Sequence, residues 1–432
     1  MKSKKFVLAG LALLAITGLL ALAGCKNDSV PETPAAKLVS ITVTTLPAQT
    51  VYSVGQEFDS TGMKVTATYD DKSQREVTGW ETNFDEVAAG KGLDKEVTVS
   101  YTEGDTPKTT TFTVTVFPKE VKVLTGYTSS HAPEGEWTYV EFGEWPQTIK
   151  EESVEIGAET LVRGGLTYYL GDDSNYYVKH SDKYYKVEPI VWRVLTTSYK
   201  APEGGTAGNA LLLAESILTG GIPYYHFDPL ELGLNGEEWS GHRIIGNKEI
   251  HPNNYEHSQI RAWLNGLSYE FKESEGATQS PKDEYKNAGF LQTAFTESAQ
   301  TLIADTTVDN SAASTTDAGN NLTQADGCSD TTDKIFLLSL QEATNSDYGF
   351  AAYDASGEGN TRIRVTTDYA EATGAYQGDP SEGYVGWWWL RSPYYYYEVS
   401  ARVILSNGYA GSLDLVDDSY GGVVPALSIS LQ

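Results

Sequence analysis

The 432-residue sequence predicts a multidomain chain in which an all-β sandwich is followed by a larger α+β domain. Residues 37–118 contain short alternations of apolar and polar side chains separated by turn signals. This pattern is typical of a sandwich with one buried face per sheet. Residues 137–432 mix strand-like and helix-like patterns. Between these sections, residues 119–136 include the polar segment Gly126–Glu136, which predicts a linker.

The first residues have the layout of a secretory signal that is removed from the mature protein. Three lysines lie among the first five residues, ahead of an apolar run, Phe6–Leu22, which Gly and Ala interrupt too often for a convincing membrane span. The run ends in Leu22-Ala23-Gly24-Cys25, which resembles the lipobox of bacterial lipoproteins. The resemblance implies that residues 1–24 are cleaved off and that Cys25 becomes an acylated N-terminus.

Such a lipid would make the protein an exported component of the cell envelope, anchored at the outer surface or the periplasmic face. Several acyl chains on one residue hold a protein at a membrane stably, whereas a single chain does not. Residues 25–36 then form a polar, Pro-containing tether between the lipid and the first strand. The alternative is an ordinary secretory signal in which Cys25 is a coincidence.

The charge of the chain argues against nucleic acid as a partner. The chain carries 31 basic and 59 acidic residues, and loss of the three signal lysines leaves 28 basic residues, so the formal charge moves from −28 to −31. A surface this acidic repels nucleic acid and anionic lipid head groups, which bind through Lys and Arg. We therefore expect no nucleic-acid binding, and contact with the membrane only through the N-terminal lipid.

Chemistry that depends on cysteine is not expected. Once Cys25 is acylated, Cys328 has no partner for an internal disulfide or for a paired-cysteine zinc site. Cys328 lies among acidic residues, which raise the pKa of a thiol and lower its reactivity, so we interpret it as incidental. Asp305–Asp333 is rich in Asp and Asn but contains no D-x-D-x-D-G loop. The sequence thus predicts no cofactor.

Three histidines, His242, His251 and His257, lie close together in the sequence near Glu249 and Glu256. A metal site is conceivable there, but the spacing matches no short helical or loop pattern. We interpret these residues as ordinary solvated histidines and predict no metal site.

The sequence also predicts no catalytic residue, because no Ser, His and Asp combination lies in a G-x-S-x-G context. A carboxylate pair for glycoside hydrolysis stays open, since its separation is a three-dimensional property.

In the first section, alternation predicts strands at Ser40–Thr44, Lys64–Tyr69, Glu96–Tyr101 and Thr111–Val116. The string ITVTTLPAQTVYSVGQEFDSTGMKVTATYDDKSQREVT resembles the bacterial group-3 immunoglobulin-like domain. The resemblance implies an Ig-like sandwich that serves as a stalk. Lys72 stands where that family usually has Gly, so we expect a small loss of turn stability.

In the second section, strands are predicted at Tyr139–Trp145, Leu166–Leu170, Tyr184–Leu195 and Ala210–Leu213. Ser258 is predicted to cap a helix that stops at Gly266, and Ser339 begins a capping box for another short helix. A further helix is predicted from apolar residues at helical spacing, namely Leu291, Phe295, Ala299 and Leu302. The polar segment Thr306–Asp333 is predicted to be a long surface loop.

Several motifs in this section, WWWLRSPYYYY, RAWLNG, TAFTESAQTLI and DKIFLLSLQEA, resemble an uncharacterised bacterial domain family with a WWLRSP motif and a G-V-R-P-A-L ending. Val424 stands where that family commonly has Arg. The ending is also similar to the C-type-lectin-like fold of formylglycine-generating enzymes, and to ligand-binding variable proteins that retroelements diversify. The resemblance implies an α+β C-type-lectin-like domain over residues 137–432. It lacks the active-site cysteines of the oxidases.

The end of the chain reads as a surface that displays side chains. Arg402–Leu405 and Ser412–Leu415 are predicted to pair around the hairpin signal Ser406-Asn407-Gly408. Aromatic rings with carboxylates beside them suit sugar recognition, and they suit a protein epitope equally well. We predict Trp387 and Trp389 to be core. The predicted binding residues are Trp388, Tyr394, Tyr395, Tyr396, Tyr397, Tyr409, Asp414, Asp417, Asp418 and Tyr420.

These observations predict a surface lipoprotein that binds an extracellular glycan or a host or other extracellular protein without catalysis. Two alternatives stay open. The first is an enzyme that acts on envelope or extracellular glycans, for which convergent carboxylates should line a cleft. The second is a purely structural envelope protein, in which the C-terminal rings would be buried.

Overall fold

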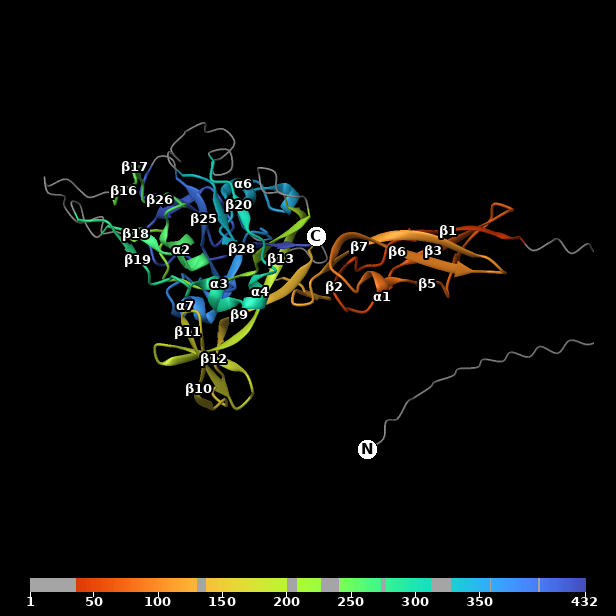
Figure 1. The fold of residues 1–432 in the computed structure, drawn as a ribbon, viewed down its shortest axis with the longest axis horizontal. Coiled ribbons are helices and arrows are strands. Elements are labelled where there is room, and N and C mark those ends of the chain that lie inside the picture. The colour runs from red at the N-terminus through yellow and green to blue at the C-terminus, as the bar shows by residue number, and fades with distance from the viewer. Residues whose placement is uncertain are drawn as a thin grey trace, which may run out of the picture.

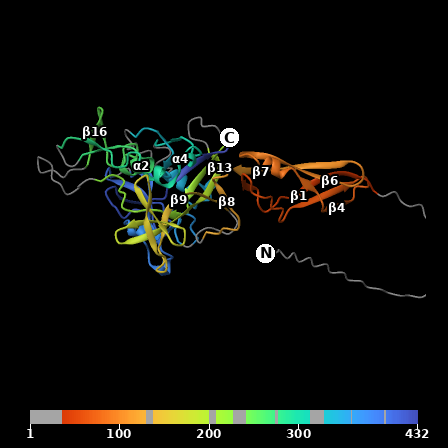
Figure 2. The same cartoon turned by 60° about the horizontal axis from the view of Figure 1, so that its bottom comes forward.

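The computed structural model describes residues 36–129, 137–199, 208–226, 241–272, 277–311, 328–357, 359–394 and 397–432. Cys25 and the predicted signal and tether up to residue 35 lie outside the described residues. The chain forms an elongated β domain beside a larger mixed domain (Figures 1 and 2). Among the residues that the structure describes, no helix is both long and apolar enough to span a membrane.

The N-terminal domain is a sandwich of two sheets whose apolar residues form one core, including Ile41 and Val65 from one sheet and Val97 and Phe112 from the other. The first sheet has the order β1 (Leu38–Thr45), β3 (Lys64–Tyr69), β4 (Gln74–Val77). The second has the order β2 (Val51–Ser53), β7 (Pro107–Phe117), β6 (Gly92–Thr102), β5 (Glu81–Thr82), with the short helix α1 (Phe84–Val87) between β5 and β6.

The four strands predicted for this domain are confirmed. The turn between β3 and β4 contains Lys72 in the left-handed region, with φ at 68°. This conformation strains a residue with a side chain and suits Gly, which explains the predicted loss of turn stability at this position.

The two domains are joined through residues predicted as linker. Strand β8 (Lys122–Leu124) pairs with β9 (Tyr139–Ile149) of the mixed domain, so part of residues 119–136 belongs to the C-terminal sheet. Ser53 of the Ig-like sandwich donates from Oγ to the carbonyl of Val121 and accepts from the amide of Val123, both at 2.7 Å. These buried bonds fix the end of the first domain against the second.

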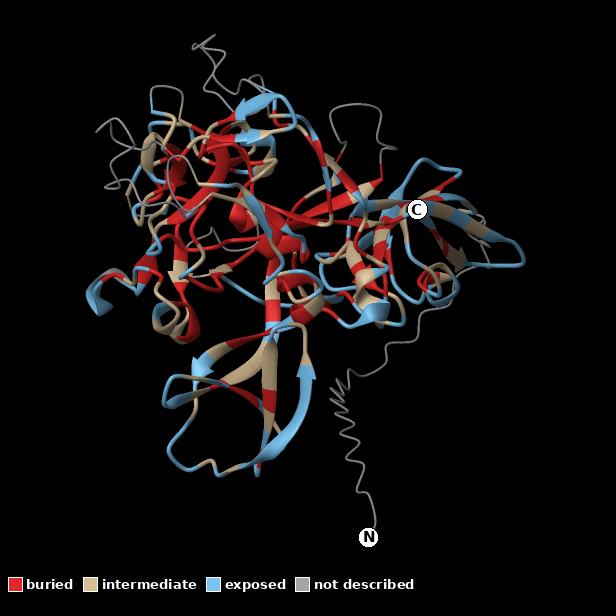
Figure 3. Ribbon diagram, turned by 60° about the vertical axis from the view of Figure 1, so that its left-hand side comes forward, coloured by how far each residue is buried: buried red, intermediate tan, exposed pale blue. Residues whose placement is uncertain are grey.

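The mixed domain is built on a nine-stranded sheet, all of whose strand pairs are antiparallel. Besides β8 and β9 it contains, in spatial order, β10 (Ile156–Arg163), β11 (Leu166–Gly171), β12 (Tyr176–His180), β13 (Lys183–Tyr199), β14 (Asn209–Ala214), β28 (Ala426–Ser430) and β22 (Ile335–Phe336). The C-terminal strand β28 therefore lies inside the sheet, and the predicted strands in this section are confirmed. Strands β10–β12 extend from the body as an arm, of which β10 is mostly exposed (Figures 1 and 3).

Smaller sheets cover the body of the domain. They are β15 (Ser216–Ile217), β23 (Arg364–Thr366) and β24 (Val385–Gly386); β16 (Arg243–Ile245) and β17 (Lys248–Ile250); β18 (Tyr269–Phe271) and β19 (Ser280–Lys282); β20 (Thr306–Val308) and β21 (Thr331–Asp333); β25 (Trp388–Pro393), β26 (Ser400–Ile404) and β27 (Ser412–Leu415). The predicted pairing of the last two strands is confirmed. The predicted loop Thr306–Asp333 is wrong at its two ends, because β20 and β21 pair there; residues 312–327 lie outside the described residues.

The helices are short. They are α2 (Gln259–Asn265), α3 (Phe290–Ala294), α4 (Glu297–Gln300), α6 (Leu340–Ala343) and α7 (Asp368–Ala372), with 3₁₀ turns η1 (Ser346–Tyr348) and η2 (Pro380–Glu382). The predicted caps of α2 and α6 are confirmed. The single helix predicted across Leu291 and Leu302 is wrong: Phe295 is extended and Thr296 caps a second helix, because its hydroxyl accepts the amide of Ala299.

Candidate functional site

The WWLRSP motif forms the interior of the mixed domain and not its surface. All six residues of β25 are buried, and Trp388 and Trp389 have no exposed area. The indole of Trp388 donates to the carbonyl of Arg362 at 3.1 Å. The prediction that Trp388 is exposed is therefore wrong: both faces of β25 are covered, so alternation exposes neither side. Trp387, which precedes the strand, is partly exposed.

Arg391 of the same motif is also buried, and it ties β25 to neighbouring segments. Its Nη1 donates to the carbonyl of Leu337 at 2.8 Å and pairs with Glu342, while Nη2 donates to the carbonyl of Asp309 at 3.1 Å. Ser392 accepts the amide of Leu340 at 2.8 Å. The motif therefore stabilises the fold by connecting β25 to the segments that contain Leu337, Leu340, Glu342 and Asp309.

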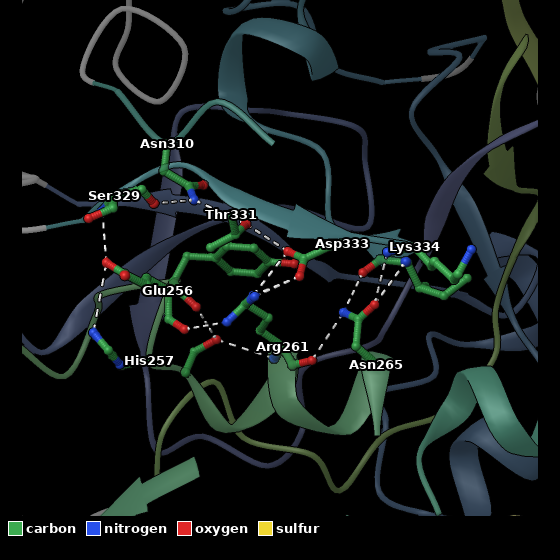
Figure 4. A network of polar contacts seen from close by, with 12 residues as sticks. Glu256, His257, Arg261, Asn265, Asn310, Ser329, Thr331, Asp333 and Lys334 are labelled. Atoms are coloured by element: carbon green, nitrogen blue, oxygen red, sulfur yellow. Dashed lines mark hydrogen bonds and ion pairs between the residues drawn. The ribbon is translucent and has the colours of Figure 1, made fainter. Parts of the chain in front are cut away.

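The RAWLNG motif also connects segments of the fold, through the polar contacts of Arg261 and Asn265 that Figure 4 shows. Arg261 donates from Nε to both carboxylate oxygens of Asp333, at 2.9 and 3.0 Å. Asn265 donates to the carbonyl of Ile335 at 2.7 Å and accepts the amides of Lys334 and Ile335, both at 3.1 Å. These contacts dock α2 onto β21 and β22.

Buried arginines recur beyond the motifs, and the sequence analysis did not single them out. Arg193 donates from Nε to Glu215 at 2.9 Å, and Arg364 lies beside this pair. Burial works to raise the pKa of Glu215, but the charges of Arg364 and Arg193 outweigh it and hold this pKa below its usual value. Arg362 is enclosed by backbone carbonyls, and burial lowers its pKa to about 10.

The predicted tyrosine face exists in part, along β26 and the turn that precedes it. We define the tyrosine strip as Tyr353, Tyr394, Tyr397 and Tyr409 with Arg402. The rings of Tyr394 and Tyr397 lie 5.7 Å apart, and the guanidinium of Arg402 lies 4.7 Å from the ring centre of Tyr394. The ring of Tyr397 is 59% exposed. The predicted residues Tyr395 and Tyr396 lie outside the described residues.

Tyr409 joins the strip through Tyr353, which sequence reasoning missed. Their ring centres lie 6.3 Å apart, and Arg402 also lies over the ring of Tyr353, at 6.0 Å. Tyr353 comes from a segment far from β26 in the sequence, so only the fold brings it here.

The predicted carboxylates gather at and after β27. Burial raises the pKa of Asp414 above its usual value, and the charges of Asp418 and Asp417 act in the same direction. Asp414 lies opposite Ala401 on β26, next to Arg402. Asp414 is thus in the same small sheet as Arg402, and Asp417 and Asp418 follow β27. Because Arg402 pairs with Leu413, the side chains of Arg402 and Asp414 point to opposite faces of this sheet.

Tyr420 lies apart from the strip, with a second group of tyrosines. Its carbonyl accepts the amide of Tyr376 at 2.9 Å. The side chains of Tyr376, Tyr384 and Tyr420 are 45%, 46% and 64% exposed. Tyr384 also lines a hollow of about 710 Å³ that Glu188, Asp368 and Glu371 border. The predicted single face is thus two tyrosine groups connected by the acidic turn.

Cys328 has a shielded thiol. Burial raises its pKa to about 11, and the charge of Glu256 acts in the same direction. The main cause is therefore burial and not the acidic residues beside it in the sequence. A thiol with this pKa is a poor nucleophile at neutral pH.

Fold and site together define a two-domain chain, in which an Ig-like sandwich carries a mixed domain with exposed tyrosines and carboxylates. The model of the bacterial Ig-like domain (group 3) matches residues 45–116. The chain belongs to the family described as domain of unknown function (DUF6273), whose model matches residues 207–431, more than half of the 432 residues. No curated protein matches the sequence. Strand β13 lies before this match but is hydrogen-bonded to β14 within it, so the folded domain is larger than the matched region.

Proposed function

We propose that this protein is an exported, lipid-anchored recognition protein of the bacterial cell envelope. In this proposal, Cys25 carries the lipid, the Ig-like domain serves as a stalk, and a C-type-lectin-like head binds an extracellular glycan without catalysis. The observation that carries the proposal is the tyrosine strip, in which Arg402 packs on Tyr394 and Tyr397 is 59% exposed.

The chemistry of the strip fits a sugar. The CH face of a pyranose packs on an aromatic ring, and the exposed ring of Tyr397 offers such a platform. Sugar hydroxyls donate hydrogen bonds, and the carboxylates of Asp417 and Asp418, in the turn that follows β27, are the acceptors we assign to them. Arg402 packs on Tyr394 and holds that ring in place, which lowers the entropy lost on binding.

The architecture supports display away from the membrane. The stalk is joined to the head by the pairing of β8 with β9 and by the buried hydrogen bonds of Ser53 to Val121 and Val123, so the junction is tied by more than the covalent chain. A rigid stalk on a polar tether carries the head outward. Exposure of Tyr397 and Tyr420 supports recognition over a purely structural envelope protein, in which these rings would be buried.

The test is a glycan array probed with residues 26–432, which contain every described residue, beside a Tyr394→Ser/Tyr397→Ser variant. We expect wild-type binding to one class of glycan and loss of at least about tenfold in affinity in the variant, because truncating an aromatic residue at the centre of a binding face typically costs about 2 kcal/mol or more. Tyr176→Ser is the matched control, since this tyrosine is 40% exposed on the arm. Thermal unfolding of both variants should stay within a few degrees of wild type.

Binding that survives in the double variant would contradict the assignment of the face. Binding to an extracellular protein, unchanged after its glycans are removed, would show that the face reads a protein epitope. Absence of any glycan binding would overturn the proposal.

A second candidate is a glycan-active enzyme, and the hollow beside Tyr384 favours it. Glu188 accepts from the amide and hydroxyl of Thr148, and Asp368 accepts the amide of Ile149 at 2.8 Å, so both carboxylates are held in position at its edge. Release of reducing ends from a glycan that binds the protein, abolished by Asp368→Asn, would support this function.

A further inference from the structure

Three side chains that bind metals converge at one edge of the mixed domain. Nε2 of His242 lies 3.1 Å from Nδ1 of His251 and 2.8 Å from Oε2 of Glu398, and Nδ1 of His251 lies 3.4 Å from the same carboxylate oxygen. The three side chains are 24%, 22% and 42% exposed, so the cluster is open to solvent on one side. All three belong to the residues that the structure describes.

The local backbone brings the two histidines together. In the β16–β17 hairpin, Arg243 lies opposite Ile250, so the next residue on each strand, His242 and His251, is also a facing pair. Their rings lie 4.6 Å apart at an angle of 82°. Arg243 is fully buried, lies 3.7 Å from the ring centre of Tyr225, and fixes the base of the hairpin.

The third group comes from the turn between β25 and β26, and a buried asparagine holds this turn in place. The amide of Asn253 donates to the carbonyl of Glu398 at 3.1 Å. Its side chain donates to the carbonyls of Tyr397 at 3.3 Å and of Ser400 at 3.0 Å. Asn253 is the third residue after the β16–β17 hairpin, so hairpin and turn are joined independently of the cluster itself.

The environment of His242 is that of a metal ligand. Its other ring nitrogen, Nδ1, lies 2.9 Å from Oε1 of Glu249. A histidine that binds a metal usually donates its second N–H to a carboxylate, which fixes the tautomer and orients the ring. With the proton on Nδ1, Nε2 of His242 carries a lone pair, and it lies 3.1 Å from Nδ1 of His251 and 2.8 Å from Oε2 of Glu398.

We propose that His242, His251 and Glu398 bind a divalent transition-metal ion, with zinc as the best match, and that Glu249 orients His242 from behind. Two imidazoles and one carboxylate form a known zinc ligand set with a fourth position open to water. Ligand atoms of a tetrahedral zinc ion, at about 2.0–2.1 Å from the metal, lie about 3.3 Å apart. The three observed separations, 2.8, 3.1 and 3.4 Å, need shifts of a few tenths of an ångström to reach that geometry.

The ion would join the hairpin to the turn that carries Tyr397, at the edge of the tyrosine strip. The site does not depend on the proposed glycan function, because it rests on the ligand geometry alone. The sequence pattern did not predict it: the two histidines are nine residues apart, and the third ligand lies at Glu398, far along the chain.

The test is calorimetric titration of Zn²⁺ into residues 26–432 that have been stripped with a chelator. We expect one zinc ion per chain. His251→Ala and Glu398→Gln each remove a ligand and should weaken binding by more than about 100-fold, whereas Glu249→Gln should weaken it about 10- to 100-fold, as for a group behind the ligand. His257→Ala is the matched control, because this nearby histidine faces Glu256 at 3.7 Å and is not part of the cluster.

Thermal unfolding in the presence of chelator shows whether each variant folds, and Co²⁺ gives a second readout through its visible absorption. Zinc should raise the unfolding temperature of the wild type and of His257→Ala, and should leave that of His251→Ala unchanged. The proposal is overturned if wild type binds no zinc, or if His251→Ala and Glu398→Gln bind it as wild type does. In either case the cluster is a hydrogen-bonded contact of His242 with Glu249 and Glu398.

Discussion

Replacing Arg261 by Leu should destabilise the mixed domain by about 3–5 kcal/mol, because it leaves a buried carboxylate without its cation. The Asp333 side chain is 1% exposed. Its carboxylate accepts hydrogen bonds from Nε of Arg261 and pairs with Nη2 of the same guanidinium at 2.7 Å (Figure 4). Its other side-chain donor is the hydroxyl of Thr331, at 2.7 Å. One hydroxyl does not compensate a buried charge.

The assay is thermal unfolding followed by tryptophan fluorescence. Trp80 is in the Ig-like domain, whereas the other eight tryptophans follow residue 136, so the signal reports mainly on the mixed domain. In a domain of this size 1 kcal/mol shifts Tm by about 2 °C, so the expected decrease is about 6–10 °C.

The matched control replaces both partners, as Arg261→Leu/Asp333→Leu. Apolar side chains of similar volume often substitute for a buried ion pair without loss, so the double variant should regain most of the lost stability. A single variant that loses less than about 1 kcal/mol, or a double variant no more stable than the single, would refute the assigned role of the pair.

Three further predictions concern acid stability, thiol reactivity and the domain junction. Arg364 and Arg193 hold the pKa of Glu215 in the folded protein below 4.5, so the ionised carboxylate stabilises the fold fully above pH 4.5. This stabilisation is lost as the pH falls through the pKa of the folded protein. Urea titrations should therefore show that the difference in free energy of unfolding between wild type and Glu215→Gln shrinks on acidification. With a pKa of about 11, Cys328 in residues 26–432 should react slowly with iodoacetamide at neutral pH. As the pH is raised toward 11, the reaction rate should increase about tenfold for each pH unit. Ser53→Ala removes two buried hydrogen bonds across the junction and should lower the free energy of unfolding by about 1–3 kcal/mol. Calorimetry should show the unfolding of the Ig-like domain at a lower temperature, more clearly separated from that of the mixed domain.

The sequence predicted local structure well where a short pattern decides it. Ser258 and Gly266 mark the ends of α2 because one supplies a side-chain acceptor and the other adopts φ of 67° without strain. Gly266 also has no room for a side chain, since a Cβ there would lie 2.1 Å from Oε1 of Gln292. The single helix predicted from the apolar spacing that begins at Leu291 was wrong, because apolar periodicity does not reveal that Thr296 caps a second helix.

The candidate sites were predicted less well, because their parts are distant in the sequence. Alternation assigned Trp388 to the surface, yet α6 and the sheets around β25 cover both of its faces. Tyr353 joins the tyrosine strip from a separate segment, and Glu398 meets the two histidines only through the folded turn. In each case the sequence did not show which segments become neighbours.

The placement of the motifs separates the scaffold of the mixed domain from its exposed turns. Arg261 and Arg391 are fastened to β21 and to α6, so the recognisable motifs specify the scaffold. Tyr397 lies in the connection between β25 and β26 of the small sheet, and the acidic turn follows β27. Hydrogen bonds such as Ser400 N–H to the carbonyl of Tyr397 and Val416 N–H to the carbonyl of Val399 hold these connections. Substitutions at the tips of these turns remove little packing, so they should alter recognition at small cost in stability. A scaffold held by buried charges that leaves these turns exposed therefore suits the recognition role proposed for this face.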